Sequence, residues 1–240
     1  MNAALGKLIK QKDLAELIRD RGPRCLIVAR HGETEWNAEG RLQGQQDIPH
    51  NNRGNSQALA TARFLSSVPI IQAHCSTLRR CQQTARPIAE ANIGQPVVIS
   101  SDLLKETALG VLEGELKDQQ STAELTRHYQ DFSKDEIHYR VPKGENLYDV
   151  AARVQRFFVD QGGLLKGPGI HLILGHRNVN KMILKHLLGL SFEEGYQVEQ
   201  EHERLYLYFD ASKELWSCWL EGTVARLTRG YATTTDGSYA

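Results

Sequence analysis

The sequence has no surplus of charge of either sign. Its 29 lysines and arginines are matched by 29 aspartates and glutamates, so the formal net charge is zero. Nucleic acids and anionic lipid surfaces attract proteins that present broad basic surfaces, and a balanced chain does not predict one. We therefore expect neither a nucleic acid nor a membrane as partner, and any cationic binding site must be local.

The chain also has few cysteines and no long apolar run. Its four cysteines form no CxxC pair and follow no regular spacing, which argues against a zinc site and a disulfide framework. No apolar stretch reaches the roughly 18 residues that a membrane-spanning helix needs, and the acidic N-terminus is not typical of a signal peptide. The sequence therefore predicts a cytoplasmic protein with reduced thiols and no bound metal.

What the sequence does contain is a regular alternation of apolar runs and amphipathic stretches. Short apolar runs predict buried strands at 25–29, 70–75, 97–100 and 170–174. Helical spacing predicts helices at 55–66, 77–91, 145–160 and 180–188, the second of them capped by Ser76. The runs 204–210 and 215–221 predict a hairpin. We therefore expect an α/β fold, a three-layer α/β/α sandwich around a mostly parallel sheet.

Both ends of the chain lie outside this pattern. Residues 1–22 carry leucines and isoleucines at helical spacing and predict an N-terminal helical extension, which either packs on the domain or binds a partner. Residues 23–222 form the predicted domain, and the whole chain of 240 residues is long enough to bury a core. The polar residues 223–240 predict a flexible C-terminal tail.

Two of the predicted strands end on a histidine. The stretch LIVARHGETEWN at 26–37 leaves a buried strand through Arg30 and His31, and LILGHRN at 172–178 leaves another through Gly175 and His176. In an open α/β sheet the ligand crevice lies beyond the carboxyl ends of the strands, so both histidines can face one crevice. Two ordinary loop histidines, among the nine in the chain, are the alternative interpretation.

Other residues near these strand ends favour a phosphate pocket. Arg30 adjoins His31, and Arg80 lies in the first turn of a predicted helix, where exposed backbone N–H groups favour an anion. Glu106 follows the strand at 97–100. Guanidinium groups offer forked donors that match phosphate oxygens. Because the sequence shows neither a P-loop nor a carboxylate cluster for magnesium, a histidine is left as the nucleophile.

An imidazole attacks phosphorus only when it is neutral. A cation about 4 Å away disfavours the protonated form by roughly 4 kcal/mol at an effective dielectric constant near 20. We therefore expect Arg30 and Arg80 to keep His31 unprotonated at neutral pH.

Six stretches of the chain carry a family resemblance. They are RHGETEWN at 30–37, GRLQGQQDIP at 40–49, STLRRCQQTA at 76–85, LKETALGVLEG at 104–114, PKGEN at 142–146 and LGHRN at 174–178. In this order they resemble the motifs of the histidine phosphatase superfamily, also called the phosphoglycerate mutase-like family. An RHG triplet alone is a weak signal, whereas six motifs in this order are a strong one. The similarity covers about residues 24–210.

The resemblance implies a role for each matching residue. His31 would be the nucleophile that becomes phosphohistidine. Glu106 would protonate the leaving oxygen and then activate water, a contribution of about 10²–10⁴ in rate. The positions that surround the phosphoryl group match Arg30, Arg80, His176 and Asn37. The positions that line the substrate pocket match Thr34, Gln43 and Gly44. The simpler interpretations are a solvated loop acid for Glu106 and a helix cap for Asn37.

The chain departs from the family pattern at positions that concern the substrate. Arg177 stands where most relatives have glycine or another small or neutral residue, and Thr77 stands where proline is frequent. PHNN at 49–52 replaces the usual Pro-Leu-Thr. The extra cation beside His176 predicts either a second acidic group on the substrate or an arginine that points away from the pocket.

The stretch between Glu106 and Pro142 separates the possible functions. It lacks the long basic, proline-rich insertion of cofactor-dependent phosphoglycerate mutases, and residues 135–150 resemble fructose-2,6-bisphosphatase domains and small phosphatases, including α-ribazole phosphatases. We therefore predict a metal-independent phosphatase for a small phosphorylated metabolite, with no cofactor. The alternatives are a phosphoglycerate mutase and a regulatory phosphate-binding protein that holds a partner through residues 1–22. A homo-oligomer is compatible with the sequence.

Overall fold

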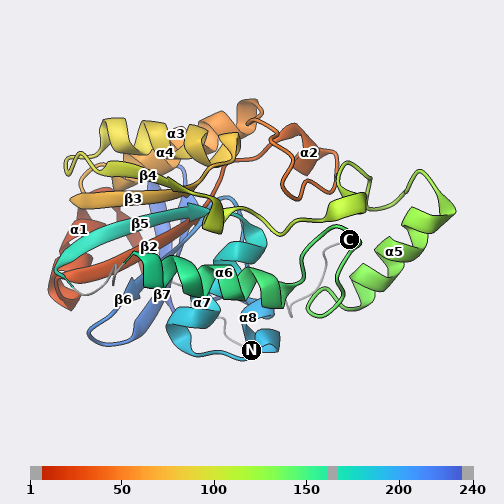
Figure 1. The fold of residues 1–240 in the computed structure, drawn as a ribbon. Coiled ribbons are helices and arrows are strands. Elements are labelled where there is room, and N and C mark those ends of the chain that lie inside the picture. Colours follow the sequence, from red (N-terminus) through yellow and green to blue (C-terminus); the bar gives the residue numbers. More distant parts are fainter. Residues whose placement is uncertain (1–6, 162–166, 234–240) are drawn as a thin grey trace.

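The computed structural model describes residues 7–161 and 167–233, which form a single eight-stranded sheet covered by helices (Figure 1). The strand order across the sheet is β1-β8-β7-β6-β2-β5-β3-β4. The strands are β1 (Lys7–Lys10), β2 (Arg24–Arg30), β3 (Ile70–Ser76), β4 (Val97–Ser101), β5 (Gly169–Gly175), β6 (Arg204–Phe209), β7 (Glu214–Glu221) and β8 (Val224–Arg229).

The sheet is mixed, which corrects the expectation of a mostly parallel sheet. Only β2, β5, β3 and β4 are joined by parallel pairs, whereas β2–β6, β6–β7, β7–β8 and β8–β1 are antiparallel. Parallel neighbours need a long crossover, while short turns allow only antiparallel pairing. The predicted hairpin is present as β6 and β7, and it continues into β8. The α/β class is confirmed.

Helices cover both faces of the sheet, as in the predicted three-layer sandwich (Figure 1). The helices are α1 (Gln11–Arg21), α2 (Glu35–Ala38), α3 (Asn52–Leu65), α4 (Arg79–Ala91), α5 (Ala123–Lys134), α6 (Leu147–Asp160), α7 (Arg177–Leu188) and α8 (Phe192–Gln197). Short 3-10 turns lie at Asp102–Leu104 and Gly110–Leu112. None of the helices in the described ranges is long and apolar enough to cross a membrane.

Strand β2 shows how one short run serves two cores. Its residues Cys25 and Ile27 pack in a cluster with α1, α3 and α4, while Leu26 and Val28 pack in a second cluster with α6 and α7. Successive side chains of a strand point to opposite faces, so a strand buried on both faces reads as a continuous apolar run. The run at 25–29 was predicted as a strand for this reason.

Two strands near the ends of the described chain join the sheet, contrary to two expectations. Residues 7–10, assigned to the N-terminal helix, form β1, and the helix begins only at Gln11. Residues 224–229, assigned to the tail, form β8, in which Ala225 and Leu227 are buried and pair with β1. Both short strands carry few apolar residues, β1 at the sheet edge and β8 next to it, and this weak alternation was missed. Residues 1–6 and 234–240 lie outside the described residues.

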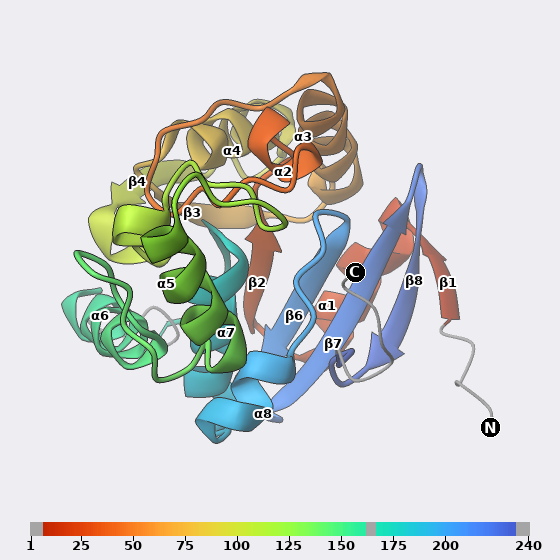
Figure 2. The same cartoon turned by 90° about the vertical axis from the view of Figure 1, so that its right-hand side faces the viewer.

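The segment 107–141 packs around a small core of its own. Leu109, Leu112, Phe132 and Val141 form a cluster with Leu42, separate from the two clusters of the main sheet. The segment contains the second 3-10 turn and α5, and it stands on the side of the molecule to which the parallel strands point (Figure 1), the side that faces the viewer in Figure 2. This position places the segment beside the candidate site.

Helix α4 begins differently from the prediction. Ser76 is the last residue of β3 and does not cap the helix; its hydroxyl accepts a hydrogen bond from the Leu78 N–H. Leu78 is the N-cap residue, and Asp47 Oδ1 accepts a hydrogen bond from the Arg79 N–H at 2.6 Å. A residue far away in sequence therefore satisfies this helix terminus and ties the 43–50 loop to it.

Candidate active site

The two strand-end histidines lie side by side. Strands β2 and β5 pair in parallel with Arg30 opposite Gly175, and the His31 N–H donates to the Gly175 carbonyl at 3.1 Å. The next residue of each strand is a histidine, and the ring centroids of His31 and His176 are 4.9 Å apart. The carboxyl ends of two neighbouring strands thus meet at one point, as expected for an open α/β sheet.

The hydrogen bond of His31 determines which ring nitrogen holds the proton. His31 is only 3% exposed, and its Nδ1 lies 2.7 Å from the Gly32 carbonyl oxygen. A carbonyl oxygen can only accept, so Nδ1 carries the hydrogen and Nε2 keeps its lone pair. Burial, followed by the charges of Arg80 and Arg30 and by the neighbouring His176, with which His31 cannot share a second positive charge, holds the pKa of His31 well below its usual value. The ring is therefore neutral at physiological pH.

Arg80 connects three parts of the site. It is 1% exposed in the first turn of α4, and its Nε donates to His176 Nδ1 at 3.2 Å. Its two terminal nitrogens donate to the carbonyls of Gln46 at 2.7 Å and Gly44 at 2.9 Å. Burial lowers the pKa of Arg80 from its usual value. Three donors in three directions fix the plane of the guanidinium.

Gly44 has a conformation and a position that exclude other residues. Its φ is +50°, and a Cβ at this position would come within 2.1 Å of Glu113 Oε1. The same oxygen accepts hydrogen bonds from the N–H groups of Gln45 and Leu109. Glu113 therefore fastens the loop that carries the Gly44 carbonyl to the segment after Glu106.

His176 is the N-cap residue of α7 and is fully buried. Since Arg80 can only donate, His176 Nδ1 is the acceptor, and Nε2, which lies 3.4 Å from Cys81 Sγ, carries the hydrogen. Burial, Arg80 and Arg30 hold the pKa of His176 well below its usual value. Both histidines of the pair are thus neutral.

Arg30 ends β2 and is tied to the chain that precedes β6. One terminal nitrogen of Arg30 donates to the Gln200 carbonyl at 2.8 Å. Burial lowers the pKa of Arg30 to about 10. The positive charges of Arg177 and Arg80 lower it further, and the negative charges of Glu106 and Glu201 oppose this shift. Arg30 therefore keeps its positive charge at neutral pH.

The Glu106 carboxylate lies at the N-terminus of α7. Its Oε1 accepts hydrogen bonds from the N–H groups of Thr107 at 2.9 Å and Asn178 at 3.2 Å. The free N–H groups of a helix N-terminus favour negative charge. These bonds hold the Glu106 carboxylate next to Asn178, two residues after His176.

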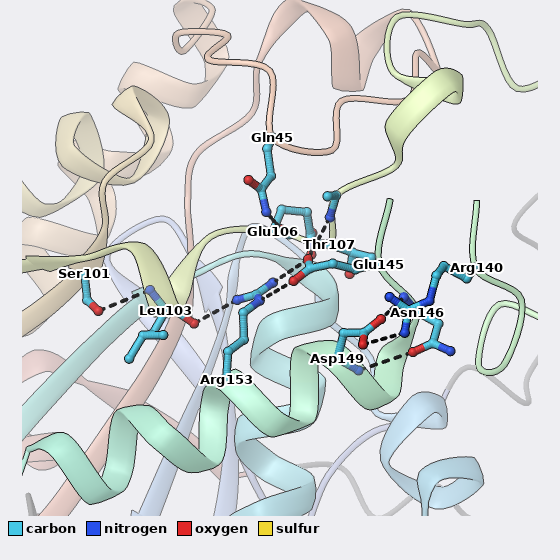
Figure 3. Close-up of polar contacts among 11 residues, drawn as sticks. Gln45, Ser101, Leu103, Glu106, Thr107, Arg140, Glu145, Asn146, Asp149 and Arg153 are labelled. Carbon is cyan, nitrogen blue, oxygen red and sulfur yellow. Dashed lines mark hydrogen bonds and ion pairs between the residues drawn. The ribbon is translucent and has the colours of Figure 1, made fainter. Parts of the chain in front are cut away.

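A partly buried ion pair supports the backbone on both sides of Glu106 (Figure 3). Arg153 of α6 donates to Glu145 Oε1 at 3.0 Å and to the Leu103 carbonyl at 2.8 Å, while Glu145 Oε2 accepts from the Ala108 N–H at 2.9 Å. The pair therefore connects residues three before and two after Glu106 to helix α6. Glu145 lies in the PKGEN motif, but its contacts were not predicted.

The remaining predicted pocket residues are placed less directly. Thr34 and Asn37 form the reciprocal cap of α2, because the Asn37 N–H donates to Thr34 Oγ1 and Asn37 Oδ1 accepts from the Thr34 N–H. Asn37 is therefore a helix cap through its side-chain oxygen, as the simpler interpretation expects. Gln43 is 8% exposed, and its Oε1 makes no hydrogen bond to any part of the chain that the structure describes.

His202 contacts the nucleophile candidate and was not predicted. Its Nδ1 lies 2.6 Å from the His31 carbonyl oxygen, so it donates there, and the two rings meet edge to face at 5.4 Å. Burial and the charge of Arg30 lower the pKa of His202 to about 2. His202 lies outside every motif, and no feature of the local sequence distinguishes it.

Among the described residues, no group of three His, Cys, Asp or Glu side chains is placed to hold a metal ion. The groups that act on His31 are the cations Arg80 and Arg30 and the rings of His176 and His202. This arrangement can receive an anion and hold it against Nε2 of a neutral histidine.

Comparisons with known proteins agree on one family. The model of the histidine phosphatase superfamily (branch 1) matches residues 26–216. The chain is 33% identical over 180 residues to 2,3-bisphosphoglycerate-dependent phosphoglycerate mutase 2 of Gloeobacter violaceus, covering 74% of this chain and 81% of that protein.

Two solved structures share the fold. The α-ribazole phosphatase from Shigella flexneri superposes with a TM-score of 0.67 at 23% identity, over 88% of this chain and 96% of that one. A mycobacterial glucosyl-3-phosphoglycerate phosphatase superposes with a TM-score of 0.62 at 22% identity, over 88% and 98%. At such low identity these two structures show similarity of the fold alone.

Proposed function

The chain belongs to the histidine phosphatase superfamily, and from this premise we propose that it is a metal-independent phosphatase. The proposed reaction is hydrolysis of a small phosphorylated metabolite through a phosphohistidine on His31. The observation that carries the proposal is the tautomer of His31, whose Nδ1–H is bound to the Gly32 carbonyl, so that Nε2 keeps a lone pair beside two arginines.

In the first proposed step His31 Nε2 attacks phosphorus and the ester P–O bond breaks. Glu106 supplies the proton that the leaving oxygen takes up. Arg30 and Arg80 stabilise the negative charge that spreads over the phosphoryl oxygens, since positioned cations do most of the work in phosphoryl transfer. His176, which Arg80 orients, is proposed to complete the wall of the pocket.

In the second step a water molecule replaces the alcohol. Glu106 accepts the proton of the attacking water, the N–P bond of phosphohistidine breaks, and inorganic phosphate leaves. His31 returns to its neutral form with its hydrogen on Nδ1. Glu106 thus acts as an acid and then as a base, as the family resemblance implies.

The test is turnover of p-nitrophenyl phosphate by wild type and by His31→Ala. We expect wild-type turnover to be insensitive to chelators and to proceed through an acid-labile phosphoenzyme. The His31→Ala variant should lose both, by a factor of about 10⁴ or more, as removal of a nucleophile does. His138→Ala is the matched control and should behave as wild type, because the His138 side chain is half-exposed and pairs with Asp135. Full activity in His31→Ala would contradict the proposal.

A phosphoglycerate mutase is the second candidate function, because a relative of that name is 33% identical to this chain. A mutase returns the phosphoryl group from the histidine to the substrate instead of to water. Incubation with 3-phosphoglycerate and a trace of 2,3-bisphosphoglycerate separates the two functions. Formation of 2-phosphoglycerate supports the mutase, and release of phosphate without it supports the phosphatase.

A further inference from the structure

One peptide unit joins His31 to Gly32, and side chains from two separate parts of the chain hold it at both ends. The His31 carbonyl accepts a hydrogen bond from His202 Nδ1 at 2.6 Å. The Gly32 N–H donates to Thr84 Oγ1 at 3.1 Å. Because a peptide unit is planar, fixing its carbonyl and its N–H fixes the orientation of the whole unit. The placement of His31 therefore depends on Thr84 as well as on His202.

Both polar groups of the Gly32 backbone are used, and its surroundings are closely packed. Its carbonyl oxygen accepts the Nδ1–H of His31 at 2.7 Å, the bond that leaves Nε2 with a lone pair. A Cβ at Gly32 would lie 2.4 Å from the Gly54 carbonyl oxygen, so the turn packs directly against the first turn of α3. A shift of Gly32 would therefore move its carbonyl relative to the His31 ring.

The hydroxyl group of Thr84 makes three contacts at this point. Thr84 lies one turn after Arg80 in α4 and is 2% exposed. Besides the Gly32 N–H, its Oγ1 contacts the Arg80 carbonyl at 2.9 Å and His50 Nε2 at 3.0 Å. A hydroxyl has one hydrogen and two lone pairs. The hydrogen goes to the Arg80 carbonyl, which can only accept, so both lone pairs accept and His50 Nε2 carries a hydrogen.

His50 is fixed between the two parts of the chain that Thr84 connects. It is 9% exposed and pairs with Thr34 in an isolated antiparallel bridge. Its N–H donates to Gln83 Oε1 of α4 at 2.9 Å. His50 stands in PHNN, where the usual Pro-Leu-Thr of the family pattern has leucine, a side chain that cannot donate. The hydrogen bond from His50 to Thr84 is therefore an addition of this chain to that pattern.

The two side chains differ in what their loss would leave behind. Without the Thr84 hydroxyl, the Gly32 N–H would be buried and without a partner. Without the His50 ring, Thr84 Oγ1 would still accept from Gly32 and would leave only one lone pair unused. A buried donor with no partner costs more than an acceptor that keeps one of its bonds. We therefore expect Thr84 to have the larger effect.

We propose that Thr84 and His50 are positioning residues for the nucleophile. His50 orients the Thr84 hydroxyl, the hydroxyl holds the Gly32 N–H, and the Gly32 carbonyl then keeps the hydrogen of His31 on Nδ1. This inference rests on the proposed function, in which His31 Nε2 attacks phosphorus. A misplacement of about 1 Å at the reacting atom costs up to about 100-fold in rate, so a series of hydrogen bonds behind the nucleophile can set kcat.

The first test is turnover of p-nitrophenyl phosphate by Thr84→Val, which keeps the shape of the side chain and removes the hydroxyl. We expect kcat to fall about tenfold with KM within about twofold, and Thr84→Ser to recover most of the loss. Thr126→Val is the matched control, because the Thr126 hydroxyl makes the same bond to a carbonyl one turn back in α5, and it should stay within about twofold. A rise in KM at unchanged kcat, or no recovery in the serine variant, overturns positioning by Thr84.

The second test concerns His50. His50→Leu should lower kcat about threefold, and His50→Gln, whose amide can donate, should recover part of the loss. Because His50 acts through the Thr84 hydroxyl, the double variant of Thr84→Val and His50→Leu should have the kcat of Thr84→Val alone, and additive losses would contradict this route. His50→Leu leaves the Gly32 N–H paired and decides the proposal if Thr84→Val does not fold. Wild-type kcat in His50→Leu would then overturn it.

A spectroscopic readout separates this inference from the proposed function. Nitrogen-15 NMR of histidine side chains reports which ring nitrogen carries the hydrogen, and the signals of His31 are those missing from His31→Ala. We expect the hydrogen on Nδ1 in wild type and Thr126→Val, and a mixture of both tautomers in Thr84→Val. Unchanged signals in Thr84→Val overturn the inference, whatever the activity. If wild type does not turn over p-nitrophenyl phosphate while the signals change as expected, the phosphatase is wrong and the positioning of His31 holds.

Discussion

The proposed phosphoryl pocket and the 107–141 segment lie beside each other, but they are built differently. In the pocket, His31, Arg80 and His176 are at most 3% exposed, and each makes a hydrogen bond to a separate element. The 107–141 segment has a small core of its own around Phe132 and carries the exposed Lys117. We infer that the pocket fixes the chemistry, while the segment can vary the substrate with little effect on it.

The strongest test of this difference is Arg80→Lys. A lysine keeps the charge but cannot donate to His176, Gln46 and Gly44 at once in a fixed plane. We expect kcat/KM for p-nitrophenyl phosphate to fall by about 10²–10³, as for the loss of one preorganised donor. The neighbouring Arg79→Lys, whose side chain is 59% exposed, should stay within about twofold. Equal behaviour of the two variants would show that the pocket does not depend on this geometry.

A smaller effect is expected from His202, which we assign as a positioning residue because it touches the nucleophile candidate only through its backbone carbonyl and ring edge. His202→Ala removes one hydrogen bond to the His31 carbonyl, and we expect kcat to fall about tenfold with little change in KM. His202→Asn can still donate and should recover part of the loss. A rise in KM with unchanged kcat, or no recovery in the asparagine variant, would speak against positioning.

The smallest effect on chemistry is expected in the 107–141 segment. Phe132→Ala should raise KM for the natural type of substrate severalfold and leave kcat for p-nitrophenyl phosphate within about twofold, because Phe132 packs in a hydrophobic cluster separate from the two of the main sheet. Its global stability in urea should fall by less than the roughly 3–5 kcal/mol expected for Phe157→Ala in the main core. Equal losses of unfolding free energy in the two variants would mean that the segment is part of the main cooperative unit.

The predictable part of the fold was the part with strong apolar periodicity. The buried strands β2, β3 and β5 and the helices α3, α4, α6 and α7 lie within a few residues of their predicted ranges. The edge strand β1 and its neighbour β8 were missed, since strands of mixed polarity gain their stability from pairing with strands distant in sequence. The cap of α4 by Asp47 was missed for the same reason, because the two groups are distant in sequence.

In the site, residue types were predictable and contacts were not. The placement of His31 and His176 after two buried strands follows from where parallel strands end. The contact of Glu113 with the Gln45 N–H joins separate segments, as do those of Glu145 and Arg153 with the backbone around Glu106, so no local pattern reports them.

The sequence alone determined which groups could meet, because apolar runs define strands and neighbouring parallel strands bring their last residues together. Only the tertiary structure decided how they meet. The proton on His31 Nδ1 follows from one carbonyl of a turn, and His202, from the chain before β6, lies against His31 because β6 pairs with β2. Hydrogen-bond direction and long-range packing depend on distances of a few tenths of an ångström, which no spacing in a sequence encodes.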